Sequence, residues 1–156
     1  MLTSFSQGRG GAGLVTTGNS IYIIGGFTGQ EAGDIHRFDL VSGRWEEIST
    51  GENREFTPRS VFGHGVLGSN ILIYGGEVDP SDMGHAGAGQ FSADTFSLDI
   101  EKNHHLSTIT ATGHQPCPRG WMASTSLGTR GLVISGGVDN SNARLGDLYI
   151  LHSDQN

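Results

Sequence analysis

Three short apolar runs, each followed directly by two glycines, form the strongest pattern in the chain. Runs of four residues that are rich in isoleucine and lack polar alternation favour strands covered on both faces. The paired glycines require either a positive φ or the close approach of another stretch of backbone. Three runs with the same ending indicate an internal repeat. The runs are residues 21–24, 71–74 and 132–135, and the pairs are Gly25 and Gly26, Gly75 and Gly76, and Gly136 and Gly137.

An arginine precedes each glycine pair at a nearly constant spacing, and the residues in between predict a hairpin. These arginines are Arg9, Arg59 and Arg119, and each is followed by a first strand and then by a turn. The turns carry glycine, mostly beside Asn or Ser, as tight connections between antiparallel strands require. They are residues 17–20, 67–70 and 127–131.

Each unit continues with a loop and a third strand whose apolar and polar positions roughly alternate. This alternation indicates strands that are less covered on one face. A short turn and a fourth strand follow in the first two units, so the repeated unit is a four-stranded meander. The third strands are residues 34–40, 94–100 and 147–151, and the fourth strands are residues 44–48 and 104–109.

The first unit carries an aromatic residue and a tryptophan, Phe38 and Trp45, after its glycine pair. With a period of about 50 residues, this arrangement resembles the kelch repeat. The second unit departs from the pattern, with Leu98 and His105 at the two positions. The resemblance implies a β-propeller in which each repeat is one blade. It also implies structural roles for Trp45 and for the glycine pairs.

The expected fold is therefore all-β, a partial kelch-type propeller with two complete four-stranded blades and three strands of a third. Propellers close with about four to eight blades, so we expect a fragment of a propeller. Its two outer blade faces would be left open, which favours self-association. We assign residues 1–156 to one domain, with blades at 9–50, at 59–111 with an inserted loop at 77–93, and an incomplete blade at 119–153.

The composition argues against some classes of partner and bears on the expected cellular compartment. The formal net charge is −7 and there are only 9 Lys and Arg residues, which argues against nucleic acid and anionic membranes. No apolar stretch is long enough to span a bilayer, and we expect a cytoplasmic or nuclear location. Cys117 is the only cysteine, so no internal disulfide can form, and we interpret it as a small, half-buried residue.

The inserted loop of the second unit is the most distinctive segment, because long loops on a rigid β scaffold often carry function. It contains Glu77, Asp79, Asp82 and His85, which are all suitable ligands for a divalent ion. Alternatively, the loop packs on itself and the two aspartates accept hydrogen bonds from their own backbone.

The arginines at the blade starts are the second group of candidates. In a propeller, Arg59 and Arg119, each preceded by proline, could line one mouth and bind an anionic group. Alternatively, they are structural residues that bond loop carbonyls between blades. Trp121 either stacks on a ligand or packs between blades.

The loop also resembles the kelch proteins of the plant nitrile-specifier group, through residues 77–82, 85–89 and 117–121. That resemblance implies Fe(II) and an anionic glucosinolate aglycone held by arginines equivalent to Arg59 and Arg119. The iron motif of that group is Glu-x3-Asp-x3-His, and no glutamate of this chain begins that spacing.

The function expected from the sequence is a binding module that presents its propeller-mouth loops to a protein partner or a small anionic ligand. On this interpretation the chain needs no metal or other cofactor and has no catalytic residue. The alternative is an Fe(II)-dependent specifier-like protein that acts on glucosinolate aglycones as a lyase or isomerase.

Overall fold

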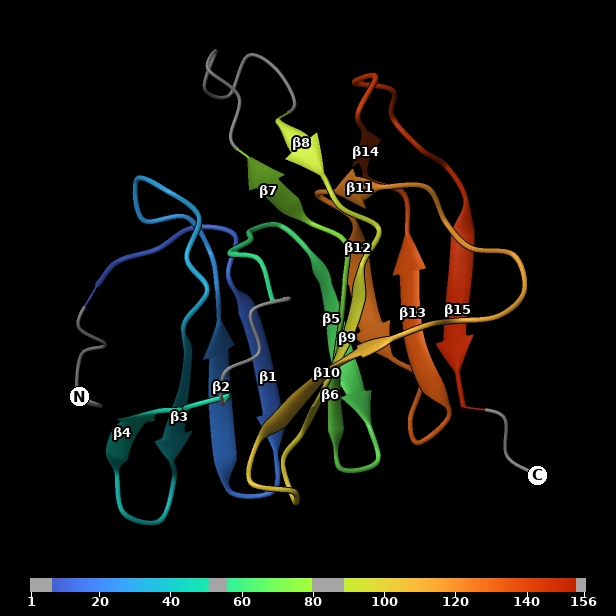
Figure 1. Cartoon of the computed structure of the whole chain (residues 1–156). Coiled ribbons are helices and arrows are strands. Elements are labelled where there is room, and N and C mark those ends of the chain that lie inside the picture. The colour runs from blue at the N-terminus through green and yellow to red at the C-terminus, as the bar shows by residue number, and fades with distance from the viewer. Residues whose placement is uncertain (1–6, 51–55, 80–88, 154–156) are drawn as a thin grey trace.

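The computed structural model describes residues 7–50, 56–79 and 89–153, and every helix or strand element in these ranges is a β-strand (Figure 1). Two antiparallel four-stranded sheets and one three-stranded sheet form successive blades, which confirms the predicted fold class. The first blade contains β1 (Gly13–Thr17), β2 (Ser20–Ile24), β3 (Ile35–Asp39) and β4 (Arg44–Glu47). The second contains β5 (Gly63–Leu67), β6 (Asn70–Tyr74), β9 (Thr95–Asp99) and β10 (His105–Ile109), and the third β12 (Ala123–Ser126), β13 (Gly131–Ser135) and β15 (Leu148–His152).

Two small two-stranded sheets lie beyond the blades at one edge. One pairs β7 (Glu77–Asp79) with β8 (Gln90–Phe91), and the other pairs β11 (Arg119–Gly120) with β14 (Val138–Asp139). Both lie at the upper edge in Figure 1, where the chain leaves β2, β6 and β13. The inserted loop of the second unit therefore begins and ends as a short β arm.

Local chemistry explains the tight turns of the meander. The turn between β1 and β2 places Gly18 at φ 53°, a left-handed conformation that glycine adopts without steric cost. The turn after β3 is fixed by Asp39, whose Oδ1 accepts hydrogen bonds from the amides of Val41 and Ser42 at 3.0 and 2.7 Å. Such Asx-turns let the side chain replace backbone partners where the chain reverses.

Coverage of the three apolar runs depends on the position of the blade. In β6, Ile71, Leu72, Ile73 and Tyr74 are all buried, as predicted for a strand covered on both faces. The same prediction is wrong for β2 and β13, where burial alternates along the strand. The physical reason is that only the second blade has a described blade on each side.

The core consists of two layers, one between each pair of neighbouring blades. Between the first and second blades, Tyr22 and Ile24 of β2 join Ile71 and Ile73 of β6 in one buried cluster. Leu72, Tyr74, Leu132 and Ile134 form the second cluster, between the second and third blades. The blades fan out from the first strands β1, β5 and β12, which lie together at the centre (Figure 1).

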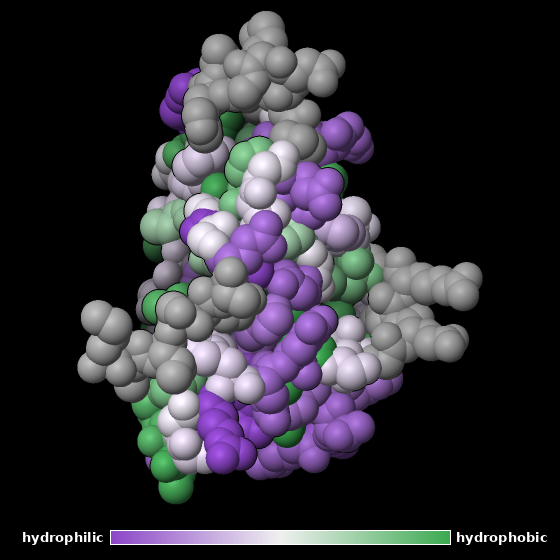
Figure 2. All heavy atoms as spheres, turned by 90° about the vertical axis from the view of Figure 1, so that its left-hand side faces the viewer, coloured by the Kyte–Doolittle hydropathy of each residue, from purple (hydrophilic) through white to green (hydrophobic). Residues whose placement is uncertain are grey.

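The side of the first blade that its edge strand β4 forms is polar. Figure 2 shows this side, with hydrophilic residues running down its middle. Arg44, Glu46 and Glu47 of β4 are exposed, and Arg37 forms ion pairs with Asp39 and Glu46 at 2.8 Å. Trp45 instead packs against Phe38, with ring centroids 5.0 Å apart. No helix of the described residues is long and apolar enough to cross a membrane.

The sequence left open whether the glycine pairs serve a positive φ or the close approach of another stretch of backbone, and the structure shows both. Gly25 and Gly75 have φ values of 54° and 68°, and Gly26 and Gly76 have values of 101° and 93°. A Cβ on Gly25 would lie 2.5 Å from the carbonyl oxygen of Arg59, which belongs to the next blade. In these two pairs the first glycine turns the chain where the next blade leaves no room for a side chain, and the second turns it where its own blade leaves none.

Candidate functional site

We call the upper edge of the blades in Figure 1 the loop edge; it consists of residues 9–12, 27–34, 59–62, 77–79, 89–94, 119–122 and 138–147. The segment before each first strand pairs here with the segment after the glycine pair of the same blade. Gly10 bridges to Phe27, Ser60 bridges to Glu77, and β11 pairs with β14. The candidates that the structure describes, Arg59, Glu77, Asp79, Arg119 and Trp121, all lie on this edge.

Trp121 is the more exposed of two exposed aromatic side chains described on this edge, and the other is Phe27, at 39%. Trp121 is 57% exposed, so it does not pack between the blades. Its φ is 58°, and Val61 and Gly11 occupy the equivalent positions at 50° and 60°. The three residues are linked across the blades, because Val61 N–H donates to Gly11 O and Trp121 N–H donates to Val61 O, each at 2.8 Å. A β-branched or bulky residue with positive φ is a true outlier, and such strain often marks functional positions.

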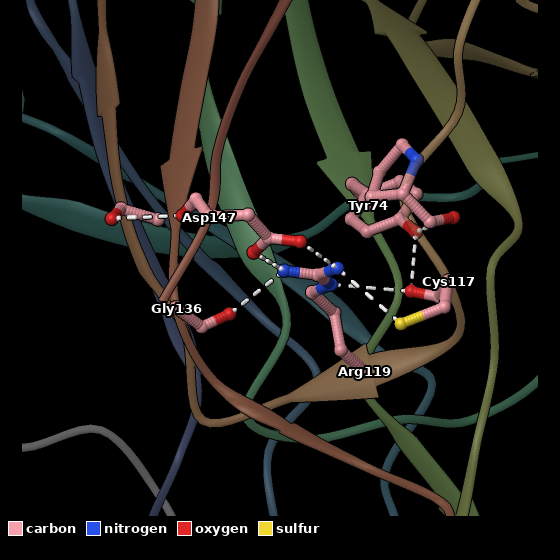
Figure 3. A network of polar contacts seen from close by, with 7 residues as sticks. Tyr74, Cys117, Arg119, Gly136 and Asp147 are labelled. Atoms are coloured by element: carbon pink, nitrogen blue, oxygen red, sulfur yellow. Dashed lines mark hydrogen bonds and ion pairs between the residues drawn. The ribbon is translucent and has the colours of Figure 1, made fainter. Parts of the chain in front are cut away.

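Arg119 is buried and fully engaged within the third blade (Figure 3). Its guanidinium forms a bidentate ion pair with Asp147 and donates to Gly136 O at 3.1 Å. It also donates to the carbonyl oxygen and the Sγ of Cys117, at 3.2 and 3.3 Å, and lies over the ring of Tyr149. Hydrogen bonds from Arg119 lower the pKa of the Asp147 carboxyl.

Arg59 makes the equivalent contacts in the second blade, with a weaker acidic partner. Nη1 donates to Gly75 O at 2.8 Å, and the guanidinium carbon lies over the rings of Phe56 and Phe96, at 5.3 and 4.7 Å from their centroids. Asp94 stays 3.7 Å from Nη2, because the same carboxyl oxygen accepts a hydrogen bond from Ser92 Oγ at 2.7 Å. Burial lowers the pKa of Arg59.

Arg9 completes the series in the first blade. It donates to Gly25 O at 2.8 Å and forms a bidentate pair with Asp34 at 2.7 and 2.9 Å. The hydrogen bonds from Arg9, aided by His36, hold the pKa of Asp34 at about 2. All three arginines thus bond the first glycine carbonyl of their own blade, which is the geometry of the structural alternative. Their guanidiniums point into the blades rather than into a mouth.

The loop edge also holds Glu31, a carboxylate that the sequence did not single out. Ser60 Oγ donates to Glu31 Oε1 at 2.8 Å, which joins the first two blades. Burial raises the pKa of Glu31, and the nearby Glu77 and Asp79 raise it further. Glu77 Oε1 in turn accepts the amide of Gly89 at 3.0 Å and closes the β7–β8 arm. Glu31 was missed because only the folded chain brings it beside the second blade.

The proposed metal ligands are not brought together in the part of the chain that the structure describes. Asp82 and His85 lie outside the described residues. Among the residues that are described, no three His, Cys, Asp or Glu side chains are grouped so that they could hold a metal ion.

A cavity of about 60 Å³ lies between the second and third blades, beneath residues 111–116. His114 stacks on Tyr149 at its rim, with ring centroids 5.8 Å apart. Tyr74 closes the other side, where its hydroxyl hydrogen-bonds the carbonyl oxygens of Pro116 and Cys117 at 3.0 Å. Burial raises the pKa of the Tyr74 hydroxyl. No local pattern predicted this cavity, because its walls come from two blades and their connection.

Successive four-stranded meanders joined through glycine pairs define a repeat protein of the β-propeller class. The Kelch motif family matches residues 8–51, which cover the first blade. The solved structure described as "Structure of YjhT" superposes with a TM-score of 0.76 at 17% identity, over 98% of this chain and 45% of the other. The first blade therefore carries a Kelch motif, and the fold of the chain is part of a kelch-type β-propeller.

Curated relatives extend the similarity beyond the first blade. The "N-(sulfonatooxy)prop-2-enimidothioate sulfolyase" of Thlaspi arvense is 28% identical over 90% of this chain and 45% of its own length. "Acyl-CoA-binding domain-containing protein 5" of Arabidopsis thaliana is 30% identical over 86% of this chain and 20% of its own length. The "Host cell factor" of Drosophila melanogaster is 26% identical over 91% of this chain and 10% of its own length. The chain therefore spans less than half the length of each of these relatives.

Proposed function

We propose that this chain is a protein-binding module and that the loop edge is its binding surface. The observation that carries the proposal is Trp121, a tryptophan that is 57% exposed at a strained backbone position. Gly11 adopts the same conformation in the first blade without strain, so the fold does not need a tryptophan there. Exposed tryptophans are the residues most often found to dominate the energy of protein interfaces.

The charge of the loop edge favours a basic partner segment. Glu31, Glu77 and Asp79 are near enough to one another to affect the titration of Glu31. The arginines add little positive potential, because Arg119 is neutralised by a bidentate carboxylate and is buried. Complementary charge mainly raises association rate and specificity, whereas an aromatic anchor supplies affinity. A segment with Lys or Arg beside an apolar residue fits both features.

A small anionic ligand, the other binding partner expected from the sequence, receives less support. It would require guanidinium donors that face the solvent, and Arg59 and Arg119 are 0% and 1% exposed. Their strongest donors are directed at the glycine carbonyls of their own blades. The geometry therefore favours a protein partner over an anion held by these arginines.

The test uses fluorescence, because the chain has only two tryptophans, Trp45 and Trp121. In the Trp45→Phe variant, Trp121 is the only emitter, and its emission should shift to the blue when a partner covers it. The probe is a library of immobilised twelve-residue peptides with Lys or Arg beside an aromatic or aliphatic residue. We expect selected peptides to bind, and Trp121→Ala to weaken them about 30-fold, as expected for the loss of about 2 kcal/mol.

The matched control is Val41→Ala, because Val41 is 78% exposed but lies on the turn between β3 and β4, at the opposite edge. Binding that survives Trp121→Ala, or that Val41→Ala weakens equally, would place the binding surface elsewhere.

The second candidate is a sulfolyase-like activity on glucosinolate aglycones, which is supported by the 28% identity over 90% of the chain to the Thlaspi arvense protein. Fe(II), if it is used, would need ligands from Asp82, His85 or segments outside the described residues. The test combines calorimetric titration with Fe(II) and product analysis with an enzymatically released aglycone. Heat of Fe(II) binding together with a changed product ratio would support this candidate. If both effects are absent, the candidate is excluded for this chain.

A further inference from the structure

The two contacts between described blades are built in the same way. Gly26 N–H donates to Arg59 O across the first, and Gly76 N–H donates to Arg119 O across the second, both at 2.9 Å. The links from Val61 to Gly11 and from Trp121 to Val61 also repeat. A joint between consecutive blades is therefore a defined set of donors, acceptors and facing side chains.

The third blade presents the donor side of such a joint, and no other described blade covers it. Gly137 has a φ of 99°, the same conformation as Gly26 and Gly76, but its amide has no acceptor among the described residues. On the same face, Leu148 and Ile150 of β15 are 61% and 48% exposed. Their register opposite Ser135 and Val133 places them on the side that points away from the second blade.

The first blade presents the acceptor side of the same joint. Its β2 residues Ile21 and Ile23 correspond to Ile71 and Ile73, which are 0% exposed because the first blade covers them. Ile21 and Ile23 are only half-buried, and Leu14 beside them is 61% exposed. The two ends of the described fold are thus complementary halves of one joint.

We propose that two copies of this chain join through these faces and close into a six-bladed propeller with a twofold axis along its centre. Propellers close with about four to eight blades, which three blades cannot do alone. A twofold axis makes both new joints identical and leaves no face open.

The internal joints fix the register of this assembly. A Cβ on Gly65 would lie 3.0 Å from Ser126 Oγ of the next blade. By the repeat, the position of Gly65 in the third blade is Thr125, and the position of Ser126 in the first blade is Thr16. Thr125 of one copy therefore faces Thr16 of the other. The assembly does not depend on the proposed protein partner, although it would bring the loop edges of both copies around one mouth.

The first experiment measures the mass of the full chain by sedimentation over a range of concentrations. We expect a dimer, twice the 16.5 kDa of one chain. Leu14→Asp and Ile150→Asp should each raise the dimer dissociation constant at least tenfold, because either change places a charge in both joints. Val41→Asp, at an exposed site away from both faces, should leave it unchanged. Circular dichroism verifies that each variant remains folded.

The second experiment distinguishes a closed ring from an open chain of subunits. The variant carries Thr16→Cys and Thr125→Cys together with Cys117→Ser, which removes the native thiol. Oxidation should give a covalent dimer as the sole product. A ladder of larger covalent species, a monomer at every concentration, or a dimer insensitive to both Asp variants would overturn the proposal.

Discussion

The glycine pairs give the sharpest quantitative prediction, because steric exclusion at Gly76 can be separated from backbone strain. A Cβ at Gly76 would lie 2.6 Å from Ser60 O and 2.7 Å from Phe62 Cβ. The φ of 93° is also one that side chains rarely adopt. Strain of this kind costs about 1–3 kcal/mol, and forcing an atom into a packed site costs about 1–3 kcal/mol more.

The matched control is Gly68→Ala, in the turn between β5 and β6. Gly68 also has a positive φ, 59°, but a Cβ there would meet nothing within 4 Å. Its replacement should cost only the left-handed conformation, about 1–2 kcal/mol. We therefore expect Gly76→Ala to lose about 2 kcal/mol more stability than Gly68→Ala, out of a total of roughly 5–15 kcal/mol for a domain.

Urea unfolding followed by circular dichroism measures this difference. Both variants and the wild type are compared at one protein concentration, because association would shift the midpoint. The slope of the free energy of unfolding against urea should be the same for all three proteins. If the two variants lose equal stability, within about 0.5 kcal/mol, the segment that holds Ser60 and Phe62 in the same blade does not exclude a side chain at Gly76, and the steric argument for this glycine is wrong.

Three further predictions concern charged groups. Arg119→Lys should destabilise the chain almost as much as Arg119→Met in thermal melts, because a lysine cannot form the bidentate pair with Asp147 and the glycine contact together. His64 accepts the amide of Leu14 at 3.3 Å, and burial lowers its pKa. Stability should therefore be full above about pH 6.5, fall as the pH drops below that value, and level off below the folded pKa, whereas His64→Gln should remove this dependence. Asp34 has a pKa of about 2, so its contribution should be present above about pH 4 and be lost between there and pH 2, and Asp34→Asn should flatten that part of the curve.

The sequence was sufficient for the blades because the signals that define them are local. The apolar run of β6 and the turn at Gly68 lie within a few residues of one another, and so do their counterparts in the other units. Because the same local pattern of strand and turn occurs in three units, the repeat could be recognised although the pattern is weak in any one unit. Only the extent of burial was overestimated for β2 and β13, since coverage of a face depends on a neighbouring blade and not on the strand itself.

The candidate site was less predictable because it depends on contacts between blades. Arginines at a propeller mouth and arginines bonded to loop carbonyls have the same spacing in sequence, and only the position of Asp147 beside Arg119 distinguishes them. The contact of Glu31 with Ser60 joins residues 29 positions apart. The positive φ of Val61 opposes the ordinary preference of valine, so no propensity could indicate it.

One physical arrangement accounts for the nearly constant spacing between each arginine and its glycine pair. The carbonyl oxygen of Arg59 accepts the amide of Gly26 from the preceding blade, while its guanidinium donates to the carbonyl of Gly75 in its own blade. Arg59 thus links the second blade to the first through its backbone. Through its side chain it stabilises the glycine turn of the second blade, which contacts the third blade. The third unit has one residue more in this span, in the turn between β12 and β13, and Arg119 keeps both contacts. The loop beyond the glycine pair is outside this span, which explains why the second unit can carry its insertion there.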